Sequence, residues 1–312
     1  MVAMKPLLLV LIPLSAHALE STLGRFDLLY APDAAKRAVE VAAHGAEVQV
    51  VLTNGTVGLS AAEIDAMPRL TLISVLGAGH ENVALAHAQA RAIAVATGAG
   101  TNDACVADHA LALLLAAVRA VPQFDRACRA GVWRDALPVQ PGVSHRRLGI
   151  VGLGAIGQRI ARRGEGFEMQ IGWHGRTRRD DVPYPWFDSV TALARWCDFL
   201  VVATPGGATT RHLVDAPVLT ALGPDGYLVN IARGSVVDTA ALAAALRERR
   251  IKGAGLDVYE GEPAPPAELL GLDNVVLSPH VAGTSPEAQQ ASLQRFLDNA
   301  ERHFAKPLVS AI

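Results

Sequence analysis

The stretch Arg147-Leu-Gly-Ile-Val-Gly-Leu-Gly-Ala-Ile-Gly-Gln-Arg-Ile-Ala-Arg162 predicts a buried strand, a glycine turn and the start of a helix. Gly152, Gly154 and Gly157 have the spacing G-x-G-x-x-G. In a dinucleotide-binding turn the first glycine permits the tight turn, the second lets a pyrophosphate approach, and the third lets helix and strand pack closely. The helix N-terminus adds free N–H donors. The spacing alone is a weak signal, because it also suits an ordinary tight loop, but its position between strand and helix favours a dinucleotide site.

Length and composition indicate a globular chain with two domains. The 312 residues suffice for two domains of ordinary size, and 51% of them are hydrophobic. A formal net charge of −2 leaves no basic face for nucleic acid. Cys105, Cys128 and Cys197 are widely spaced and odd in number, which favours buried thiols in a reducing compartment. We therefore expect a cytoplasmic protein without a metal site or a nucleic-acid partner.

The N-terminal segment permits two interpretations. Lys5, the apolar run 7–14 and Ala16-His17-Ala18 imitate a secretory signal with its cleavage site. The run is short and interrupted by Pro13, and a buried strand over 7–12 explains it equally well. Because the pattern that follows needs this strand, we favour the strand. No stretch approaches the ~20 apolar residues that span a membrane, so no membrane association is expected.

Strands and helices alternate along the chain, which indicates parallel sheets with helices on their faces. Ser60 and Glu63 have the pattern of a capping box that starts a helix. One long helix is expected from Asp103 to Val121, and its apolar character all round places it inside its domain or against a second subunit. A connector rich in Pro and Gly follows over 135–144. The expected strands are 7–12, 26–30, 48–52, 70–76, 93–97, 169–173, 199–203, 227–231, 253–258 and 275–277, with further helices at 33–44, 83–91, 239–249 and 286–304.

The strand after the glycine turn ends in Gly175, Arg176 and Thr177. An NAD-binding unit usually has an acid about 20 residues beyond the first glycine, bonded to the ribose 2′-hydroxyl. This chain has no acid at that strand end. A cation and a hydroxyl suit a 2′-phosphate, so we expect NADP(H) to be preferred, with NAD(H) possible. In the alternative interpretation the loop is solvated and Asp180 and Asp181 partly neutralise its arginines.

Arg233, Glu262 and His280 each follow a predicted strand, and the carboxyl ends of parallel strands gather at one crevice. An arginine can grip a carboxylate, and a histidine can protonate a carbonyl oxygen as hydride arrives at carbon. A carboxylate on the second ring nitrogen orients the imidazole and favours its protonated form. Taken singly, each residue is better explained as an ion pair, a loop acid or a strand-end histidine, and the spacing does not prove that they converge. The turn Gly77-Ala78-Gly79 is likewise either an anion-binding turn or an ordinary connection.

Several segments resemble the D-isomer-specific 2-hydroxyacid dehydrogenase family. The resemblance runs from about residue 70 to 286 and is weaker before residue 70. In a further segment, 106–111, the family usually carries Glu where this chain has Asp108. The four main segments are Gly149-Ile-Val-Gly-Leu-Gly-Ala-Ile-Gly157, Val229-Asn-Ile-Ala-Arg-Gly-Ser-Val-Val-Asp238, Gly253-Ala-Gly-Leu-Asp-Val-Tyr-Glu-Gly-Glu-Pro263 and Ser278-Pro-His-Val-Ala-Gly283.

The resemblance implies an α/β fold with two flavodoxin/Rossmann-like doubly wound domains. A cofactor domain over 99–283 is inserted into a substrate domain made of 1–98 and 284–312. The long helix would serve a homodimer. Trp133 lies where related reductases have a tryptophan that helps to shape the substrate pocket across the dimer. Its local pattern departs from theirs, which leaves simple packing as an equal alternative.

The resemblance also implies roles at the reacting end. Arg233 resembles the substrate-binding arginine, and His280, which would also contact the substrate, resembles the acid/base. Glu262 rather than Glu260 matches the carboxylate partner of the histidine, because it directly precedes the proline. The backbone N–H groups of the turn formed by Ala78 and Gly79 would hold the substrate carboxylate.

At the cofactor end, Asp257 resembles the residue that bonds the nicotinamide carboxamide and so orients the ring. The implied cofactor-binding set is Gly152, Gly154, Ala155, Ile156, Gly157, Gly175, Arg176, Thr177, Thr204, Ile231, Asp257 and Gly283.

Gly175-Arg176-Thr177 and the tract 272–280 resemble the NADPH-dependent glyoxylate/hydroxypyruvate reductase branch. The expected activity is reduction of a small 2-keto acid, glyoxylate or hydroxypyruvate, to the D-2-hydroxy acid. Reductases of larger 2-keto acids share these residues and remain an alternative. A long phosphoglycerate dehydrogenase would need an extra domain, and a formate dehydrogenase would carry an amide in place of Glu262. A dinucleotide-sensing, corepressor-like protein without catalysis is a further alternative, which needs no intact Arg, Glu and His set.

Overall fold

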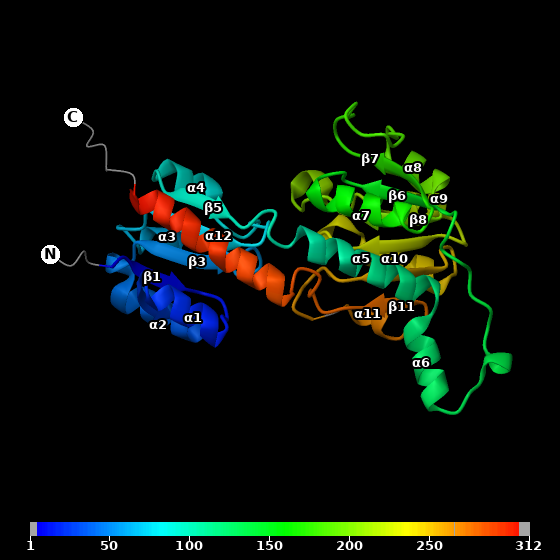
Figure 1. The fold of residues 1–312 in the computed structure, drawn as a ribbon, viewed down its shortest axis with the longest axis horizontal. Helices are drawn as coiled ribbons and strands as arrows, with labels where there is room; N and C mark the ends of the chain where they lie inside the picture. Colours follow the sequence, from blue (N-terminus) through cyan, green and yellow to red (C-terminus); the bar gives the residue numbers. More distant parts are fainter. Residues whose placement is uncertain (1–4, 265, 306–312) are drawn as a thin grey trace. The chain divides into compact units, whose positions relative to one another are not determined.

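The computed structural model describes residues 5–264 and 266–305, which form two compact units (Figure 1). Unit 1 comprises Met1–Asn102 and Ser285–Ile312, and unit 2 is Asp103–Thr284. The chain of unit 2 is therefore inserted into that of unit 1. In each unit a parallel sheet is covered by helices on both faces, which confirms the predicted doubly wound α/β fold.

Unit 1 contains a five-stranded sheet in the order β2-β1-β3-β4-β5, with every neighbouring pair parallel. The N-terminal apolar run forms β1, which pairs with β2 on one side and β3 on the other, so the strand interpretation is confirmed. The strands are β1 (Leu7–Val10), β2 (Asp27–Tyr30), β3 (Val50–Asn54), β4 (Leu72–Leu76) and β5 (Ala94–Thr97).

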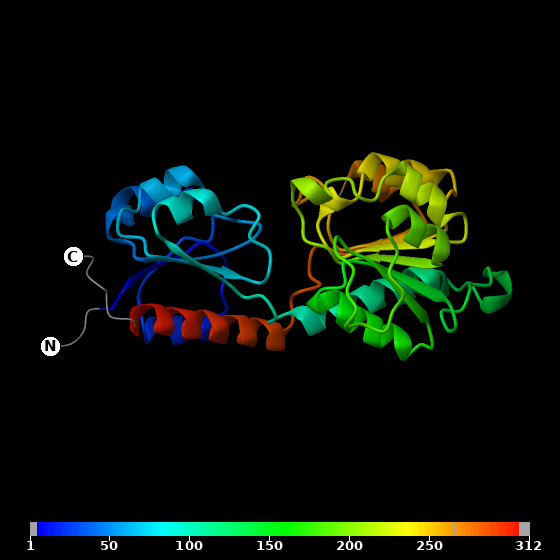
Figure 2. The same ribbon diagram turned by 90° about the horizontal axis from the view of Figure 1, so that it is seen from above.

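Helices cover both faces of this sheet (Figure 2), and an apolar core lies beneath the helices on each face. Leu8 of β1 packs with Phe296 of the last helix, whereas the next residue, Leu9, packs with Ile64 on the other face. This alternation follows from the two-residue period of a strand. The first face carries α1 (Ala16–Leu23) and α12 (Pro286–Ala305), and the second carries α2 (Ala34–His44), α3 (Ala61–Asp65) and α4 (Leu85–Ala90). The capping box predicted from Ser60 and Glu63 is present at the start of α3.

Unit 2 contains a six-stranded parallel sheet in the order β11-β10-β9-β8-β6-β7. The chain starts at β6, proceeds outward to β7 and then returns across β6 to β8. The direction of winding therefore reverses between β6 and β8, and in doubly wound sheets the ligand crevice lies at such a point. The strands are β6 (Arg147–Val151), β7 (Gln170–His174), β8 (Phe199–Val202), β9 (Tyr227–Asn230), β10 (Gly253–Leu256) and β11 (Val275–Leu277).

The helices of unit 2 enclose two cores on the two faces of its sheet. Leu114 and Ile160 belong to one core, and Leu193, Leu219 and Leu242 belong to the other. The first face carries α5 (Asp103–Val118) and α7 (Ala155–Glu165), and the second carries α8 (Val190–Trp196), α9 (Ala216–Leu222) and α10 (Thr239–Arg247), while α11 (Ala267–Leu270) precedes β11.

The prediction of one helix from Asp103 to Val121 is wrong, because the structure divides this stretch. Helix α5 ends at Val118, and α6 (Val121–Arg129) continues at an angle of 57°. Ala120 between them has a positive φ of 52°. A continuous helix would place the Pro122 ring against the carbonyl of Val118, whereas in the first turn of α6 its missing N–H has no partner to lose. Most apolar side chains of α5, among them Val106, Leu111 and Leu114, are buried inside unit 2, against α7 and the sheet.

No single helix in the described ranges is long and apolar enough to cross a membrane, although the bent pair α5 and α6 passes the same test of length and composition.

Gly157 should be essential for the stability of unit 2. A Cβ at this position would lie 2.1 Å from the carbonyl oxygen of Gly152, so Gly157→Ala must push α7 away from β6. Overpacking of this kind costs about 1–3 kcal/mol, and we expect a loss of this size in the free energy of unfolding measured by urea titration. Gly142→Ala is the control, because nothing lies within 4 Å of a Cβ there. Equal urea midpoints for Gly157→Ala and the wild-type protein would contradict the prediction.

Candidate functional site

The glycine turn between β6 and α7 has different surroundings at each of its three glycines. Gly152 has a φ of +95°, and a Cβ there would lie 2.9 Å from the carbonyl oxygen of Ala203, at the end of β8. A Cβ on Gly157 would collide with the turn itself, whereas nothing lies within 4 Å of one on Gly154. Close packing therefore requires glycine at the first and third positions, while the middle glycine borders open space.

The donor groups at this turn suit a pyrophosphate. Gly154 is the N-cap of the 11-residue helix α7, and no side chain caps its first turn. No acidic residue lies in that turn. The N–H groups at a helix start and the positive end of its dipole favour an anion. The residues present therefore fit the phosphates of a dinucleotide, and the open side of Gly154 leaves room for them.

Ion pairs distinguish the arginines in the loop after β7. Arg178 lies 3.2 Å from Asp180, and Arg179 hydrogen-bonds Asp181. The hydrogen bond from Arg179 lowers the pKa of Asp181. Arg176 is exposed and has no ion pair in the part of the chain that the structure describes. Asp180 and Asp181 therefore neutralise Arg178 and Arg179. They do not neutralise Arg176, which the sequence predicts to bind the 2′-phosphate.

Arg179 also connects this loop to the glycine turn, which the sequence did not reveal. Its Nη1 donates a hydrogen bond to the carbonyl of Leu153 at 2.9 Å, while its Nε donates to Asp181. Trp186 orders the same loop by donating from Nε1 to the carbonyl of Gly175 at 3.2 Å. The segment 175–181 is thus tied to the turn between Gly152 and Gly154.

His280 and Glu262 form a hydrogen-bonded pair. The distance from His280 Nδ1 to Glu262 Oε2 is 2.7 Å, and the other carboxylate oxygen accepts a hydrogen bond from the Tyr259 N–H at 2.9 Å. Burial would raise the pKa of Glu262, but the bonds from His280 and Tyr259 and the charge of Arg233 hold it below its ordinary value. The carboxylate is therefore ionised at neutral pH, and the His280 nitrogen that faces it carries a proton.

The neighbouring acid, Glu260, belongs to a different group of residues. Its carboxylate lies 2.9 Å from His212 Nε2 and accepts a hydrogen bond from the Thr239 N–H. Burial opposes ionisation, but these bonds lower the pKa of Glu260. Of the two acids considered in the sequence, only Glu262 hydrogen-bonds to His280.

Arg233 follows β9 and lies next to the segment that carries Glu262. A Cβ on Gly234 would lie 1.8 Å from the carbonyl carbon of Tyr259, so the two loops are in direct backbone contact. The Arg233 Nη1 donates to the carbonyl of Ala232 at 2.6 Å, which turns the guanidinium back over its own strand end. Arg233, Glu262 and His280 are therefore brought together at the carboxyl ends of β9, β10 and β11.

The other predicted cofactor residues also lie at carboxyl ends of strands in unit 2. Thr204 follows β8, and its Cα would be 3.0 Å from a Cβ on Gly152. Ile231 follows β9 and is buried, and Gly283 follows the His280 segment. Ala155 and Ile156 form the first turn of α7. All of these residues thus belong to the edge of the sheet on which the glycine turn lies.

Asp257 lies buried among hydrogen-bond donors from the segment around His280. It is 1% exposed, and its carboxylate accepts hydrogen bonds from the N–H groups of Val281 and Ala282, both at 2.9 Å. It also accepts from the hydroxyl of Ser278, which in turn contacts His109 of α5. The sequence did not single out Ser278 or His109, because α5 is apolar and a lone histidine on it gives no signal.

Ala78 and Gly79 lie in unit 1, after β4. Ala78 is exposed, and its carbonyl lies 3.1 Å from Nδ1 of His80. A Cβ on Gly55 would lie 2.6 Å from the carbonyl oxygen of Gly79, so the neighbouring turn supports this one from behind. The turn is therefore held by backbone packing, as a fixed set of N–H donors requires.

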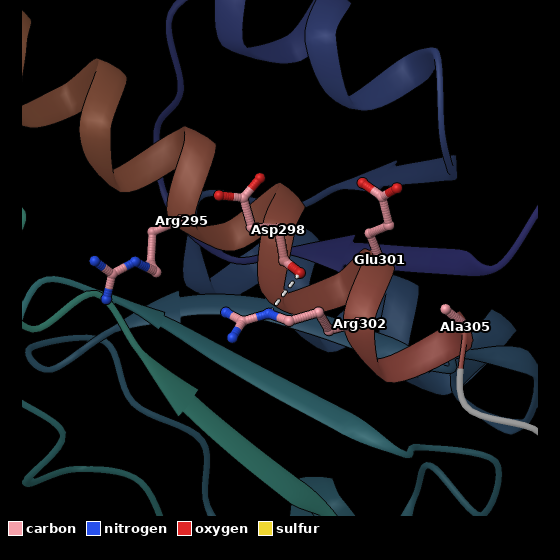
Figure 3. Close-up of a pocket in the computed structure, with 5 residues that line it drawn as sticks. All are labelled: Arg295, Asp298, Glu301, Arg302 and Ala305. Atoms are coloured by element: carbon pink, nitrogen blue, oxygen red, sulfur yellow. Dashed lines mark hydrogen bonds between the residues drawn. The ribbon is translucent and has the colours of Figure 1, made fainter.

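Unit 1 also has a surface pocket along α12, which no sequence prediction included (Figure 3). One of its charged side chains bonds back to the helix, since Arg302 Nε donates to the backbone carbonyl of Asp298 at 3.2 Å. The mixed charges favour no particular ligand. The lining residues are Arg295, Asp298, Glu301, Arg302 and Ala305.

Comparisons with known proteins agree with this geometry. The model of the D-isomer specific 2-hydroxyacid dehydrogenase, NAD binding domain, matches residues 111–282. A glyoxylate/hydroxypyruvate reductase A of Arabidopsis thaliana is 37% identical over 298 residues, which are 95% of each chain. A hydroxyphenylpyruvate reductase of Plectranthus scutellarioides is 36% identical over 97% of this chain and 98% of its own. A solved NADPH-dependent glyoxylate/hydroxypyruvate reductase from Sinorhizobium meliloti, in complex with NADP and malonate, has a TM-score of 0.89 at 36% identity, covering 97% of this chain and 94% of that one.

Glu262 should stabilise the fold in a pH-dependent way. Because its pKa is lowered from 4.5 in the folded chain, its carboxylate contributes stability above that value, and the contribution is lost as the pH falls through the lowered pKa. Glu262→Gln should therefore be less stable than the wild-type protein at about pH 7, and the difference in urea midpoint should shrink as the pH falls below 4.5. The exposed Glu268 provides the control substitution, Glu268→Gln. A difference that stays constant or grows on acidification would show that the carboxylate is not stabilised by its partners.

Proposed function

The chain belongs to the D-isomer-specific 2-hydroxyacid dehydrogenase family, and we propose that it reduces glyoxylate or hydroxypyruvate to the D-2-hydroxy acid with NADPH. It is an NAD(P)-dependent oxidoreductase. The observation that carries the proposal is the 2.7 Å pair of His280 and Glu262 beside Arg233. The substrates named for the Arabidopsis and Sinorhizobium relatives support a small 2-keto acid.

His280 is the proposed proton donor. Its Nδ1 faces the Glu262 carboxylate, so Nε2 is the nitrogen left to protonate the keto oxygen of the substrate. The ionised carboxylate stabilises the imidazolium and fixes the ring in one orientation. NADPH, when bound, supplies the hydride for the keto carbon. The proton and the hydride together convert the 2-keto acid to the 2-hydroxy acid.

Arg233 is the proposed substrate-binding residue. Its guanidinium can hold the substrate carboxylate with two parallel hydrogen bonds and polarise the adjacent carbonyl. We also propose that the turn of Ala78 and Gly79 in unit 1 contributes backbone N–H groups that bind a substrate carboxylate. Unit 1 is then the substrate domain and unit 2 the cofactor domain.

The glycine turn and the loop after β7 are the proposed binding site for NADPH. The first turn of α7 would hold the pyrophosphate, on the open side of Gly154. Arg176 and Thr177 would bind the 2′-phosphate, which distinguishes NADPH from NADH. Asp257, Thr204, Ile231 and Gly283 complete the proposed set. The NADP-bound Sinorhizobium structure supports this preference, and NADH remains usable because the same turn fits both.

A homodimer in the cytoplasm is the proposed working state. The segment from α6 to residue 143 presents apolar side chains, among which Val121 is 53%, Trp133 70% and Val139 98% exposed. A second copy of the chain would cover these residues, and Trp133 could then help to shape the partner's substrate pocket. The expectation of three buried thiols is wrong, because only Cys197 is buried and Cys128 is exposed; all three are free, which supports a reducing compartment.

His280→Ala should remove most of the turnover and leave NADPH binding intact. Loss of a general acid typically lowers the rate by about 10²–10⁴-fold. The test follows NADPH absorbance with glyoxylate, hydroxypyruvate and hydroxyphenylpyruvate, and measures NADPH binding separately by fluorescence titration.

Three other outcomes of this experiment would change the proposal. Wild-type turnover in His280→Ala would exclude His280 as the acid. A preference of the wild-type protein for hydroxyphenylpyruvate would favour a larger substrate, as named for the Plectranthus relative. Tight NADPH binding without turnover of any acid would favour a dinucleotide sensor.

Arg176→Ala should weaken the binding of NADPH much more than the binding of NADH. A hydrogen bond to a charged group contributes about 1.5–3 kcal/mol, so the KM for NADPH should rise by about 10–100-fold while that for NADH changes little. Arg178→Ala is the matched control, because it removes the same charge from an arginine that pairs with Asp180. Equal effects of Arg176→Ala on both cofactors, or equal effects of the two substitutions, would refute the 2′-phosphate assignment.

A further inference from the structure

Three polar side chains connect α5 to the segment that carries His280. His109 Nε2 lies 2.7 Å from Ser278 Oγ and 3.4 Å from Asp257 Oδ1. Ser278 Oγ also hydrogen-bonds directly to Asp257 Oδ1. The three residues come from α5, from the end of β11 and from the end of β10, all within unit 2. In the described structure none of the three side chains forms a hydrogen bond or an ion pair with the side chains of His280 or Glu262.

The direction of the hydrogen bonds follows from the chemistry of the groups. An ionised carboxylate can only accept, so the single hydroxyl proton of Ser278 is donated to Asp257. The Ser278 oxygen can then only accept from His109, which must carry a proton on Nε2. Tyr259 holds the backbone of Ser278 in place, donating to its carbonyl at 2.7 Å and accepting from its N–H at 2.9 Å. Burial raises the pKa of Tyr259 to about 12, so its hydroxyl remains a donor.

Asp257, the acceptor at the end of this chain of hydrogen bonds, fixes the backbone conformation around His280. The carboxylate of Asp257 accepts from the N–H groups of Val281 and Ala282, and its backbone carbonyl accepts from the N–H of His280 at 2.9 Å. His280 itself has a φ of +53°, in the left-handed region that a non-glycine residue enters only at a cost of about 1–2 kcal/mol. The bonds to Asp257 offset that cost.

We infer that His109 is a positioning residue for the proposed reaction, because its bond to Ser278 fixes the Asp257 carboxylate that holds the His280 backbone. The effect on catalysis rests on the proposed function, whereas the effect on the His280 backbone rests only on these hydrogen bonds. His109 is 27% exposed, so its ring is not required to fill the core of unit 2. Position 109 therefore requires a side chain that can donate a hydrogen bond from the place of Nε2.

The test compares His109→Leu, which removes the donor, with His109→Gln, whose amide N–H can replace Nε2–H. At metal sites, loss of a hydrogen bond that orients a ligand typically costs about 10–100-fold, and we adopt the lower end of that scale for a residue that acts through two others. We expect kcat to fall about tenfold in His109→Leu with a smaller change in KM, and to return towards the wild-type value in His109→Gln. Asp108→Asn is the control, because Asp108 lies next to His109 but pairs with Arg163 on α7.

Amide hydrogen exchange gives a readout that does not depend on activity. In His109→Leu the amides of residues 278–284 should exchange faster than in the wild-type protein, whereas His109→Gln and Asp108→Asn should protect them normally. If no 2-keto acid is turned over but exchange changes as expected, the proposed function fails and the positioning role stands. Unchanged exchange in His109→Leu, or equal kcat in the Leu and Gln variants, would overturn the inference.

Ser278→Ala makes the test independent of any packing defect on α5. It removes the link between His109 and Asp257 while the histidine ring stays in place. We expect the same faster exchange over 278–284 and a similar fall in kcat. Normal protection of these amides in Ser278→Ala would overturn the inference even if His109→Leu failed to fold.

Discussion

The close contact between α7 and β6 is the constraint on which the functional edge of unit 2 depends. The third glycine of the turn lies so near the first that no side chain fits between them. This contact brings the start of α7 to the end of β6, beside the point where the sheet reverses its winding order. The free N–H groups of the helix and the carboxyl ends of β8, β9 and β10 therefore face the same side. A looser turn would separate the anion-binding groups from the strand ends.

Three carboxylates follow strands of the unit 2 sheet at this edge, and each is stabilised by different donors. Glu262 is held by an imidazole and a backbone N–H, whereas Asp257 is buried among two backbone N–H groups and a hydroxyl. Asp181 is bound by a guanidinium on the exposed loop. Because a buried carboxylate without partners is costly, the arrangements around Glu262 and Asp257 also fix the segments of backbone that supply their donors. The same hydrogen bonds thus set the charge of these carboxylates and the position of the backbone around them.

The sequence was sufficient for those features that depend on local pattern. The alternation of strands and helices, the capping box at Ser60 and the glycine turn all follow from backbone geometry and spacing. The break between α5 and α6 falls inside the apolar run of the expected helix, and Pro122, which lies just beyond the expected end at Val121, supplies its physical reason. The relation of Glu262 to His280 came from a resemblance to known motifs rather than from spacing.

Contacts between side chains distant in sequence could not be obtained in this way. His109 and Ser278 are 169 positions apart, and nothing in either neighbourhood marks a hydrogen bond between them. The bond of Arg179 to the Leu153 carbonyl is similar, because several arginines follow one another and only the folded loop selects one of them. Such contacts depend on rotamers and on the packing of whole elements, which residue patterns do not specify.

The position of α12 after unit 2 in the sequence affects when unit 1 can complete its folding. Phe296 and Leu297 complete the core on one face of the first sheet, yet they emerge from the ribosome long after β1–β5. At about 5–20 residues per second, the intervening unit 2, which is continuous in sequence, has time to fold first. The nascent first sheet meanwhile exposes an apolar face that includes Leu8, Val10 and Leu52. Until α12 is made, this face is open to chaperones. A truncated chain released at that stage would aggregate through the same face.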